Sequence, residues 1–199
     1  MDTRASDADL LQRWGEGSTQ AGNELVERHF ATLHRFFRNK AGSELEDLVQ
    51  QTFLACVEAR ARFRGDASFK TFLLSIARNQ LLKHYSRAER RVIDASLSSV
   101  RDLRTSPTGA IAKREDQALL LEALRQLPLD AQVILELGFW EGLDAIEIAA
   151  VLAVPLNTAY SRLRRAKLAL REKLTALSPP GTSIDPDQTA SETRSSVLG

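Results

Sequence analysis

The spacing of apolar residues along the chain matches an α-helix almost wherever it is regular. Residues 45–56 place an apolar or small side chain at every third or fourth position over three turns, and residues 26–37 and 69–77 repeat this pattern. Such spacing gathers the apolar side chains on one face of a helix. The sequence shows neither the alternation expected of β-strands nor an internal repeat. The chain is therefore predicted to be all-α.

The helical spacing stops between residues 92 and 114, where Ser, Thr, Pro and Gly cluster as they do in linkers. Helical spacing returns at residues 120–137, and the Pro-, Ser- and Thr-rich composition after Leu177 indicates a disordered tail. The predicted organisation is a flexible N-terminus at 1–9, a helical domain at 10–91, a linker at 92–114, a second small helical domain at 115–177 and a tail at 178–199.

Basic charge is concentrated in two segments, although the net charge of the chain is only +1. Residues 60–91 carry nine basic and two acidic side chains, and residues 156–174 carry six basic and one acidic. The local net charges are therefore +7 and +5. Because the distribution of charge governs attraction to nucleic acid more than its total, two basic surfaces joined by a linker suit a protein that touches DNA at two places.

The second basic segment and the residues before it predict a helix–turn–helix. Asp144 and Glu147 have the spacing of a capping box at the start of a short helix. Residues 153–155, Ala-Val-Pro, should break that helix, and Asn157 is expected to cap the next one. The second helix is predicted to run from Thr158 to about Leu174.

This second helix has an apolar side and a basic side, as a DNA-reading helix requires. An α-helix fits the major groove, where Arg pairs with guanine edges and Ser with several bases. Other Arg and Lys side chains bind phosphates and hold the register, as we expect of Arg162 and Lys167, whereas Arg165 is expected to read a base. The residues predicted to face DNA are Thr158, Tyr160, Ser161, Arg162, Arg164, Arg165 and Lys167.

Two strings in the first domain resemble bacterial RNA polymerase sigma factors of the extracytoplasmic-function (ECF) type. Residues 46–53 read EDLVQQTF, which is similar to the family's helix that docks on the clamp of RNA polymerase. Residues 63–87 read FRGDASFKTFLLSIARNQLLKHYSR, which is similar to its promoter-melting segment. Residues 142–167 are similar to its second DNA-binding domain. The resemblance implies sigma region 2 at 10–91 and a sigma region 4 helix-turn-helix at 115–177.

The resemblance implies a role for each domain in transcription initiation. The first domain would bind core polymerase and melt the minus-ten element, and the second would read the minus-thirty-five element. Melting requires a site that encloses an unstacked base, which the loop at 63–68 is placed to form. The implied core polymerase contacts are Asp47, Leu48, Gln50, Gln51 and Phe53, and the implied minus-ten contacts are Phe63, Arg64, Gly65, Arg78, Asn79 and Lys83.

The chain offers little for catalysis. Cys56 lies on an apolar helical face and is expected to pack in the core, and the three histidines have no metal-ligand spacing. No nucleophile–base pair, paired carboxylates or phosphate-binding glycine loop is found. We therefore expect no enzyme activity, no metal and no cofactor. With no signal-peptide core and no membrane span in the sequence, we also expect a cytoplasmic location.

The expected partners are core RNA polymerase, through the clamp and flap of its large subunits, promoter DNA and, as is common in the family, an anti-sigma factor. Two other classes of protein remain open from the sequence. A stand-alone helix–turn–helix regulator would bind a pseudo-palindromic site as a dimer, but it gives no reason for the basic segment at 60–91. An enzyme that flips its target base would need a metal site or a positioned acid–base pair.

Overall fold

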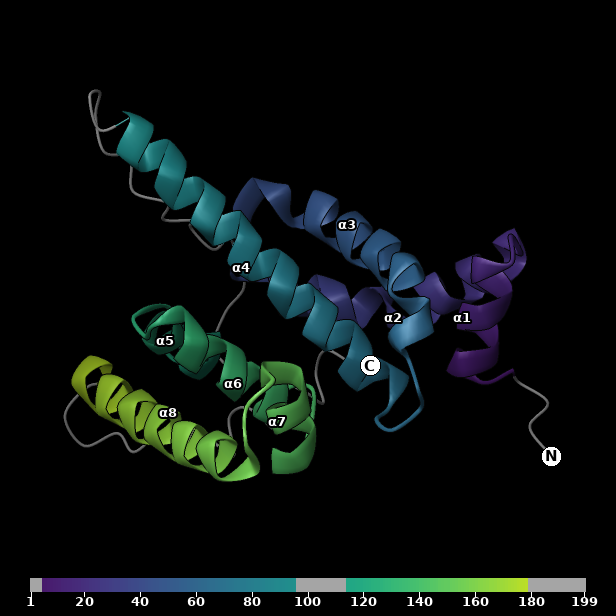
Figure 1. Ribbon diagram of the computed structural model, residues 1–199. Coiled ribbons are helices and arrows are strands. Elements are labelled where there is room, and N and C mark those ends of the chain that lie inside the picture. The colour runs from purple at the N-terminus through teal and green to yellow at the C-terminus, as the bar shows by residue number, and fades with distance from the viewer. Residues whose placement is uncertain (1–4, 96–113, 179–199) are drawn as a thin grey trace. The chain divides into compact units, whose positions relative to one another are not determined.

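The computed structural model describes residues 5–95 and 114–178 of the chain. These residues form eight α-helices and two short 3-10 helices, with no β-strand among them, so the predicted all-α class is confirmed. The chain divides into two compact units, Met1–Thr105 and Ser106–Gly199. Figure 1 labels the helices of both units.

The first unit contains four α-helices around a core of Leu and Phe side chains. They are α1 (Asp7–Gly15), α2 (Thr19–Arg38), α3 (Leu45–Glu58) and α4 (Phe69–Ala95), with short 3-10 helices at Gly42–Glu44 and Arg60–Arg62. Helix α3 packs between α2 and α4, and α1 packs on α2. The core includes Leu25, Phe36, Phe37, Leu73 and Leu81, each fully buried. The helical spacing predicts the burial of Leu33, Phe37 and Leu73, but Phe30, which belongs to the same spacing at residues 26–37, is 40% exposed.

Serine residues cap three of these helices and fix where they begin. The hydroxyls of Ser6, Ser18 and Ser68 accept hydrogen bonds from the backbone N–H groups three residues later, at 3.2, 3.3 and 3.1 Å. Such caps satisfy N–H groups that have no partner within the helix. Because α1 begins at Asp7, residues 7–9 are helical, whereas the sequence placed them in a flexible N-terminus.

The second unit is built around its last and longest helix. It contains α5 (Arg114–Arg125), α6 (Leu129–Phe139), α7 (Ala145–Leu152) and α8 (Leu156–Leu177), and α8 contacts each of the other three. The side chains of Leu120, Ile134, Ile148 and Leu170 are buried together with their neighbours in this core. The helical spacing that the sequence shows at 120–137 is therefore confirmed.

The predicted linker and tail fall mostly outside the described residues. Helix α4 continues to Ala95 and α5 begins at Arg114, so the residues at both edges of the predicted linker are helical. The tail predicted from residue 178 lies beyond the described ranges apart from Ser178 itself. Within those ranges, no helix combines the length and apolar character that a bilayer span requires.

Candidate nucleic-acid interface

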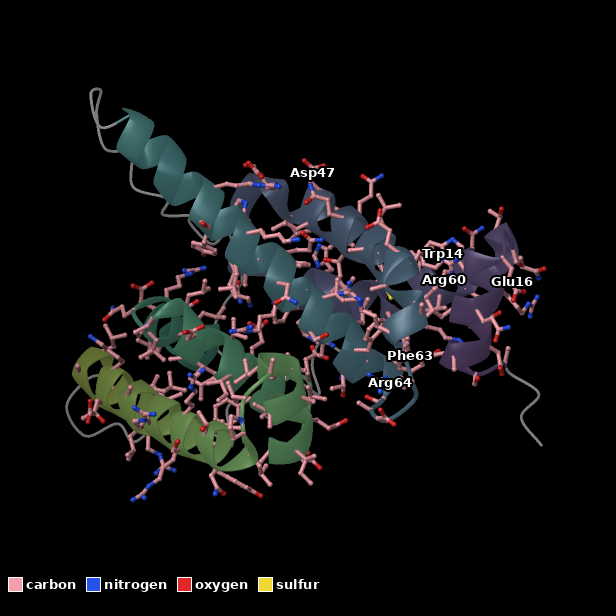
Figure 2. All side chains as sticks on the ribbon, in the orientation of Figure 1. Trp14, Glu16, Asp47, Arg60, Phe63 and Arg64 are labelled. Carbon is pink, nitrogen blue, oxygen red and sulfur yellow. The ribbon has the colours of Figure 1, made fainter. Side chains whose placement is uncertain are left out.

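The loop at residues 63–68 is anchored at both ends and exposed in between. At its start, the Phe63 ring lies edge-on to Phe69, with centroids 5.8 Å apart, and 5.2 Å from the Phe72 ring. At its end, the Ser68 hydroxyl contacts the Thr71 hydroxyl at 2.8 Å and caps α4. Residues 64–67 are exposed, and Figure 2 labels Phe63 and Arg64 at this loop. The anchors hold the ends of the loop while its middle stays open to a ligand.

Gly65 allows the backbone of this loop to turn. Its φ is +79°, in the left-handed region that other residues adopt only with strain, and nothing lies within 4 Å of the position a Cβ would take. The space beside the Gly65 backbone is therefore free, which suits the close approach of a base or sugar. Phe63, in contrast, is half-buried in an aromatic cluster, so its ring supports the loop as well as bordering it.

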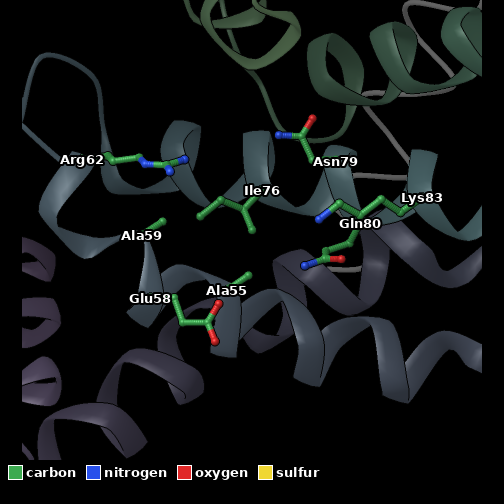
Figure 3. Close-up of a pocket in the computed structure, with 8 residues that line it drawn as sticks. All are labelled: Ala55, Glu58, Ala59, Arg62, Ile76, Asn79, Gln80 and Lys83. Carbon is green, nitrogen blue, oxygen red and sulfur yellow. The ribbon is translucent and has the colours of Figure 1, made fainter.

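A groove runs along the surface between α3 and α4, next to this loop in sequence. It has a volume of about 250 Å³, with Ala55, Glu58 and Ala59 on one wall and Ile76, Asn79, Gln80 and Lys83 on the other (Figure 3). Arg62 of the intervening 3-10 helix also lines it. The groove thus offers two cations, one carboxylate, amide groups and apolar side chains. That combination suits a single strand, whose bases need flat apolar surfaces and whose phosphates need cations.

Arg78 does not share this surface, contrary to the expectation that Arg78, Asn79 and Lys83 lie on one side of the helix. Asn79 and Lys83 are one turn apart and line the groove, whereas Arg78 is absent from its walls. The Nε of Arg78 is buried and has no hydrogen-bond partner among the described residues. The α4 residues on the groove wall follow the i, i+3, i+4, i+7 spacing of one helical face from Ile76 to Lys83, and Arg78 falls outside that series.

The outer face of α3 carries the polar residues of the EDLVQQTF string. Asp47, Gln50 and Gln51 are exposed, as the sequence predicts, and Figure 2 labels Asp47 on this helix. Leu48 and Phe53 are only 3% and 5% exposed, so both belong to the core and neither is available to a partner. The prediction that these two contact polymerase directly is therefore wrong, because it followed the motif string and not the face of the helix.

The structure adds one residue to this face that the sequence reasoning missed. Leu54 is 55% exposed on α3, one turn after Gln50 and Gln51. Leu54 lies outside the i, i+3, i+4 series of core residues, and this spacing alone would have predicted that its side chain is exposed. The outer face of α3 therefore combines an acidic residue, two amides and one large apolar side chain.

In the second unit, α7 and α8 form the predicted helix–turn–helix. The Asp144 carboxylate accepts from the Glu147 N–H at 2.8 Å, and the Asp144 N–H donates to the Glu147 carboxylate at 3.2 Å, so the predicted capping box is confirmed. Ala153 closes α7 in the left-handed conformation, with φ +53°. The turn therefore has the geometry that Gly usually supplies, but with Ala in its place.

The second helix of this motif begins earlier than predicted. Helix α8 starts at Leu156 with Pro155 at the cap position, and Asn157 is exposed within its first turn. The Pro155 carbonyl accepts from Thr158 N–H at 2.9 Å and from Ala159 N–H at 3.1 Å. Proline already has the φ that an extended cap requires, so the chain enters the helix without a capping side chain, and the predicted Asn157 cap is wrong.

The exposed side of α8 carries most of the residues predicted to face DNA. Tyr160 is 54% exposed, and Ser161, Arg164 and Arg165 are also exposed. Thr158 and Arg162 are partly buried at the edge of this face. In this structure the Ser161 hydroxyl donates to the Thr158 carbonyl at 3.0 Å, and Arg165 Nε donates to the Ser161 carbonyl at 3.3 Å.

Lys167 lies apart from this surface, against the body of the second unit. Its ammonium sits 4.9 Å from the centroid of the Phe139 ring of α6, and its side chain is partly buried. A cation over an aromatic face is held by the ring's negative charge distribution. The prediction that Lys167 lies on the side opposite the apolar one is therefore wrong, and α6 rather than solvent faces it.

Cys56, the one cysteine of the chain, is buried in the first unit. Burial raises the pKa of the Cys56 thiol to about 12, so Cys56 is an unreactive core residue, as predicted. Among the described residues, no group of three His, Cys, Asp or Glu side chains is placed to hold a metal ion.

Two family models match this chain, one in each unit. Sigma-70 region 2 matches residues 25–91, and Sigma-70, region 4 matches residues 117–170. Among curated proteins, the RNA polymerase sigma-H factor of Pseudomonas aeruginosa is 30% identical over 192 residues, covering 89% of this chain and 98% of that protein. The ECF RNA polymerase sigma-E factor of Escherichia coli is 29% identical over 188 residues, with the same coverage of each chain.

Solved structures share the fold. The structure of CnrH in complex with the cytosolic domain of CnrY matches with a TM-score of 0.65 and 25% identity, covering 87% of this chain and all of that chain. The sigma factor RpoE of Bartonella quintana, solved with the anti-sigma factor NepR, matches with a TM-score of 0.64 and 23% identity, covering 77% of this chain and 96% of that chain. The region 2 match accounts for the first unit, which a stand-alone regulator would not. The chain belongs to the ECF sigma factors, which bind DNA and direct promoter-specific initiation of transcription by RNA polymerase.

Proposed function

We propose that the two units divide promoter recognition between them. The first unit binds and melts the minus-ten element through the loop at 63–68 and the groove between α3 and α4. The second unit reads the minus-thirty-five element through α8. The observation that carries the proposal is that the open loop lies between two anchors, Phe63 and Ser68, so that it offers a preformed site for an unstacked base.

In the first unit, the open backbone at Gly65 and the exposed Arg64 enclose a base that has left the stack. Enclosure matters because unstacking costs a few kcal/mol, which the pocket must offset. The Asn79 amide can both donate to and accept from a base edge, and Lys83 and Arg62 hold the phosphates of the separated strand. Arg78 contributes charge from a neighbouring face and not from the groove itself.

In the second unit, Tyr160, Ser161, Arg164 and Arg165 point away from the core and read base edges in the major groove. In the free protein Arg165 uses its Nε to bind the Ser161 carbonyl, which leaves both terminal nitrogens of the guanidinium for a guanine edge. Thr158 and Arg162, at the edge of the face, contact phosphates. Lys167 takes part only if its side chain leaves the Phe139 ring.

Core polymerase holds the two units at their elements. The outer face of α3, with Asp47, Gln50, Gln51 and Leu54, docks on the polymerase clamp, and the second unit docks near the flap. Each DNA surface is small, so the free protein binds promoters weakly. Joining both units to polymerase raises the effective concentration of each at its element and makes the pair effective.

The protein itself supplies binding, and the polymerase carries the chemistry, so we propose no enzyme activity for this chain. It acts in the cytoplasm, where RNA polymerase works. An anti-sigma partner is also proposed, as the family resemblance implies; the similar sigma factor RpoE of Bartonella quintana was solved in complex with the anti-sigma factor NepR. Such a partner would compete with DNA and polymerase for the surfaces described above.

Run-off transcription with purified core polymerase tests the proposal across a promoter library. We expect promoter-dependent transcripts that require this protein and that share a minus-ten and a minus-thirty-five element. An Asp47→Lys variant should lose core binding because it replaces an acidic side chain on the α3 face with a basic one, whereas Arg164→Ala, in the second unit, should retain it. Absence of any promoter-dependent product across the library would contradict the proposal.

A further inference from the structure

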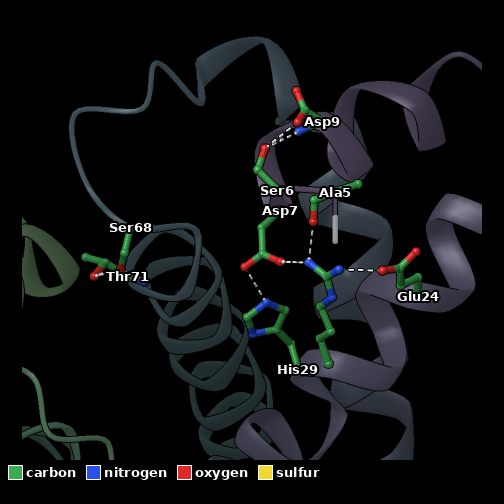
Figure 4. A network of polar contacts seen from close by, with 9 residues as sticks. Ala5, Ser6, Asp7, Asp9, Glu24, His29, Ser68 and Thr71 are labelled. Carbon is green, nitrogen blue, oxygen red and sulfur yellow. Dashed lines mark hydrogen bonds and ion pairs between the residues drawn. The ribbon is translucent and has the colours of Figure 1, made fainter. Parts of the chain in front are cut away.

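His29 of α2 joins two parts of the first unit that are far apart in sequence. Its Nε2 lies 2.8 Å from the Oδ2 of Asp7, at the start of α1, and its ring centroid is 5.0 Å from that of Phe69, the first residue of α4. The His29 side chain is only 12% exposed. One nitrogen of the imidazole is therefore held from α1 (Figure 4), and the ring also contacts the aromatic cluster through Phe69.

Asp7 is itself fixed, so it can hold His29 in one orientation. Its second oxygen, Oδ1, accepts from Arg28 Nη1 at 2.9 Å, and the same nitrogen donates to the Ala5 carbonyl at 2.8 Å. Arg28 also binds Glu24 (Figure 4). The hydrogen bond to Asp7 raises the pKa of Arg28, so this guanidinium stays charged and keeps the Asp7 carboxylate in place.

Phe69 connects His29 to the loop at 63–68. Its buried ring meets Phe63 edge-on at 5.8 Å, and Phe63 is the residue at which the loop begins. Phe69 also follows Ser68, the capping residue at which the loop ends. A shift of the Phe69 ring would therefore move both ends of the loop together, because interiors are close-packed and transmit displacement.

We propose that His29, oriented by Asp7, is a positioning residue for promoter opening. It fixes Phe69 and, through Phe69, the Phe63 ring, so that the loop presents its open backbone and Arg64 in one geometry. A leucine would fill the same space but would not be held in one orientation by a carboxylate. Binding sites depend on such supporting contacts to hold the residues that touch the ligand. The inference rests on the proposed role of this loop in opening.

The test uses the full chain bound to core polymerase and compares three variants. His29→Ala removes the ring and the contact to Asp7, whereas Asp7→Ala keeps the ring and removes that contact together with the ion pair between Asp7 and Arg28. His34→Ala is the matched control, because His34 is also on α2, stacks on Phe30 at 5.8 Å and lies 3.9 Å from Glu46, away from Phe69. Three quantities are measured: the affinity for core polymerase, opening of a duplex promoter, and binding of the same promoter with its minus-ten segment already unpaired.

We expect both test variants to lower the extent of duplex promoter opening about three- to tenfold. This factor corresponds to the free energy of one aromatic contact. Core affinity and binding of the unpaired promoter should change by no more than about twofold, as for a surface substitution. The His34→Ala control should match the unchanged protein in every measurement. Equal losses of core affinity and of opening would instead indicate general loosening of the unit and would overturn the inference.

Three further variants, one of them a double variant, separate this inference from the proposed function. Combining His29→Ala with Phe63→Leu should produce a defect no larger than that of the more severe single variant, because both act through one contact; multiplied defects overturn the inference. His29→Gln retains a donor for Asp7 without the ring and should show the same opening defect; normal opening would overturn it. If Phe63→Leu alone leaves opening unchanged, the proposed role of the loop fails, whatever His29 does.

Discussion

The two elements that we propose to face DNA each contain or follow one residue in the left-handed conformation, and the chain fills the two positions differently. In the first unit the residue is Gly65, with φ +79° and no atom within 4 Å of the place where a Cβ would lie. In the second unit it is Ala153, with φ +53°, placed where α7 ends. The Val154 N–H, just after it, donates to the Ala149 carbonyl at 3.1 Å and locks the turn to the preceding helix.

Each unit keeps its proposed binding element in shape by a different means. The loop at 63–68 has irregular backbone, and the contacts at its two ends must hold its middle in the shape that receives an unstacked base. Helix α8 has regular backbone along its whole length, packed on three other helices, so it can read a duplex without rearranging. Sites on regular elements are more rigid than sites on loops, and the loop gains its geometry from aromatic packing instead.

We expect the largest effect from a substitution on the buried face of α8, which tests whether packing of that face makes the helix rigid. Leu170→Ala should lower the free energy of unfolding of the second unit by about 2–5 kcal/mol, because it leaves a cavity under a fully buried side chain. Leu168→Ala, on the exposed side of the same helix, should change it little. Hydrogen exchange resolved by segment measures both; faster exchange in α2 as well as α8 would contradict the independence of the units.

The next effect concerns base reading by this rigid helix. Arg165→Ala should reduce discrimination at one base pair of the minus-thirty-five element by about 1–3 kcal/mol, because a guanine contact is lost. Arg162→Ala should weaken all promoters alike and lower the salt slope by about one unit. Binding of reconstituted holoenzyme to promoter variants at several salt concentrations distinguishes the two. Identical effects of both substitutions on every sequence would refute the division into base and phosphate contacts.

Helical spacing predicts the cores of both units, and the sequence-based expectations fail where function depends on which face of a helix a residue occupies. Leu48 and Phe53 sit inside a string that suggests a partner contact, but their spacing relative to Cys56 already places them in the core. Arg78 follows the same pattern, since it stands next to Asn79 in the string but not on the same surface. A motif gives residue types in order, whereas the helix period decides which of them share a surface.

Other features of the site depend on contacts that no local pattern contains. The contact between His29 and Asp7 joins residues 22 apart on two helices, and its direction depends on how α1 packs. The position of Lys167 over Phe139 likewise follows from the packing of α8 on α6. The prediction placed the start of α8 just after Asn157 because Asn is a favourable cap in general. The turn at Ala153 sets the chain direction earlier, so that the helix already begins after Pro155.

A smaller effect is expected from removing the N-caps of α7 and α4. Asp144→Ala should destabilise the second unit by about 1 kcal/mol, and Ser68→Ala should destabilise the first unit by a similar amount, since each removes an N-cap. Only Ser68→Ala should also reduce promoter opening, because Ser68 anchors the loop. Asp144→Asn and Ser68→Thr, which retain a cap, serve as controls. Equal effects of the two Ala variants on opening would argue that the loop has no special dependence on its anchor.

The smallest effect concerns the two left-handed residues themselves, and the expected signs are opposite. A non-glycine residue in this conformation costs about 1–2 kcal/mol of strain, while Gly costs about 0.5–1 kcal/mol of additional unfolded-chain entropy relative to Ala. Gly65→Ala should therefore destabilise the first unit by about 0.5–1 kcal/mol, through strain alone, because no atom obstructs the new methyl group. Ala153→Gly should stabilise the second unit by a similar amount and leave promoter selectivity unchanged, because packing on three helices already fixes α8. Denaturation of each variant measures its stability, and transcription from matched promoters measures its selectivity. A loss of selectivity in Ala153→Gly would show that α8 depends on a stiff turn as the loop depends on its anchors, and the contrast between the two elements would no longer hold.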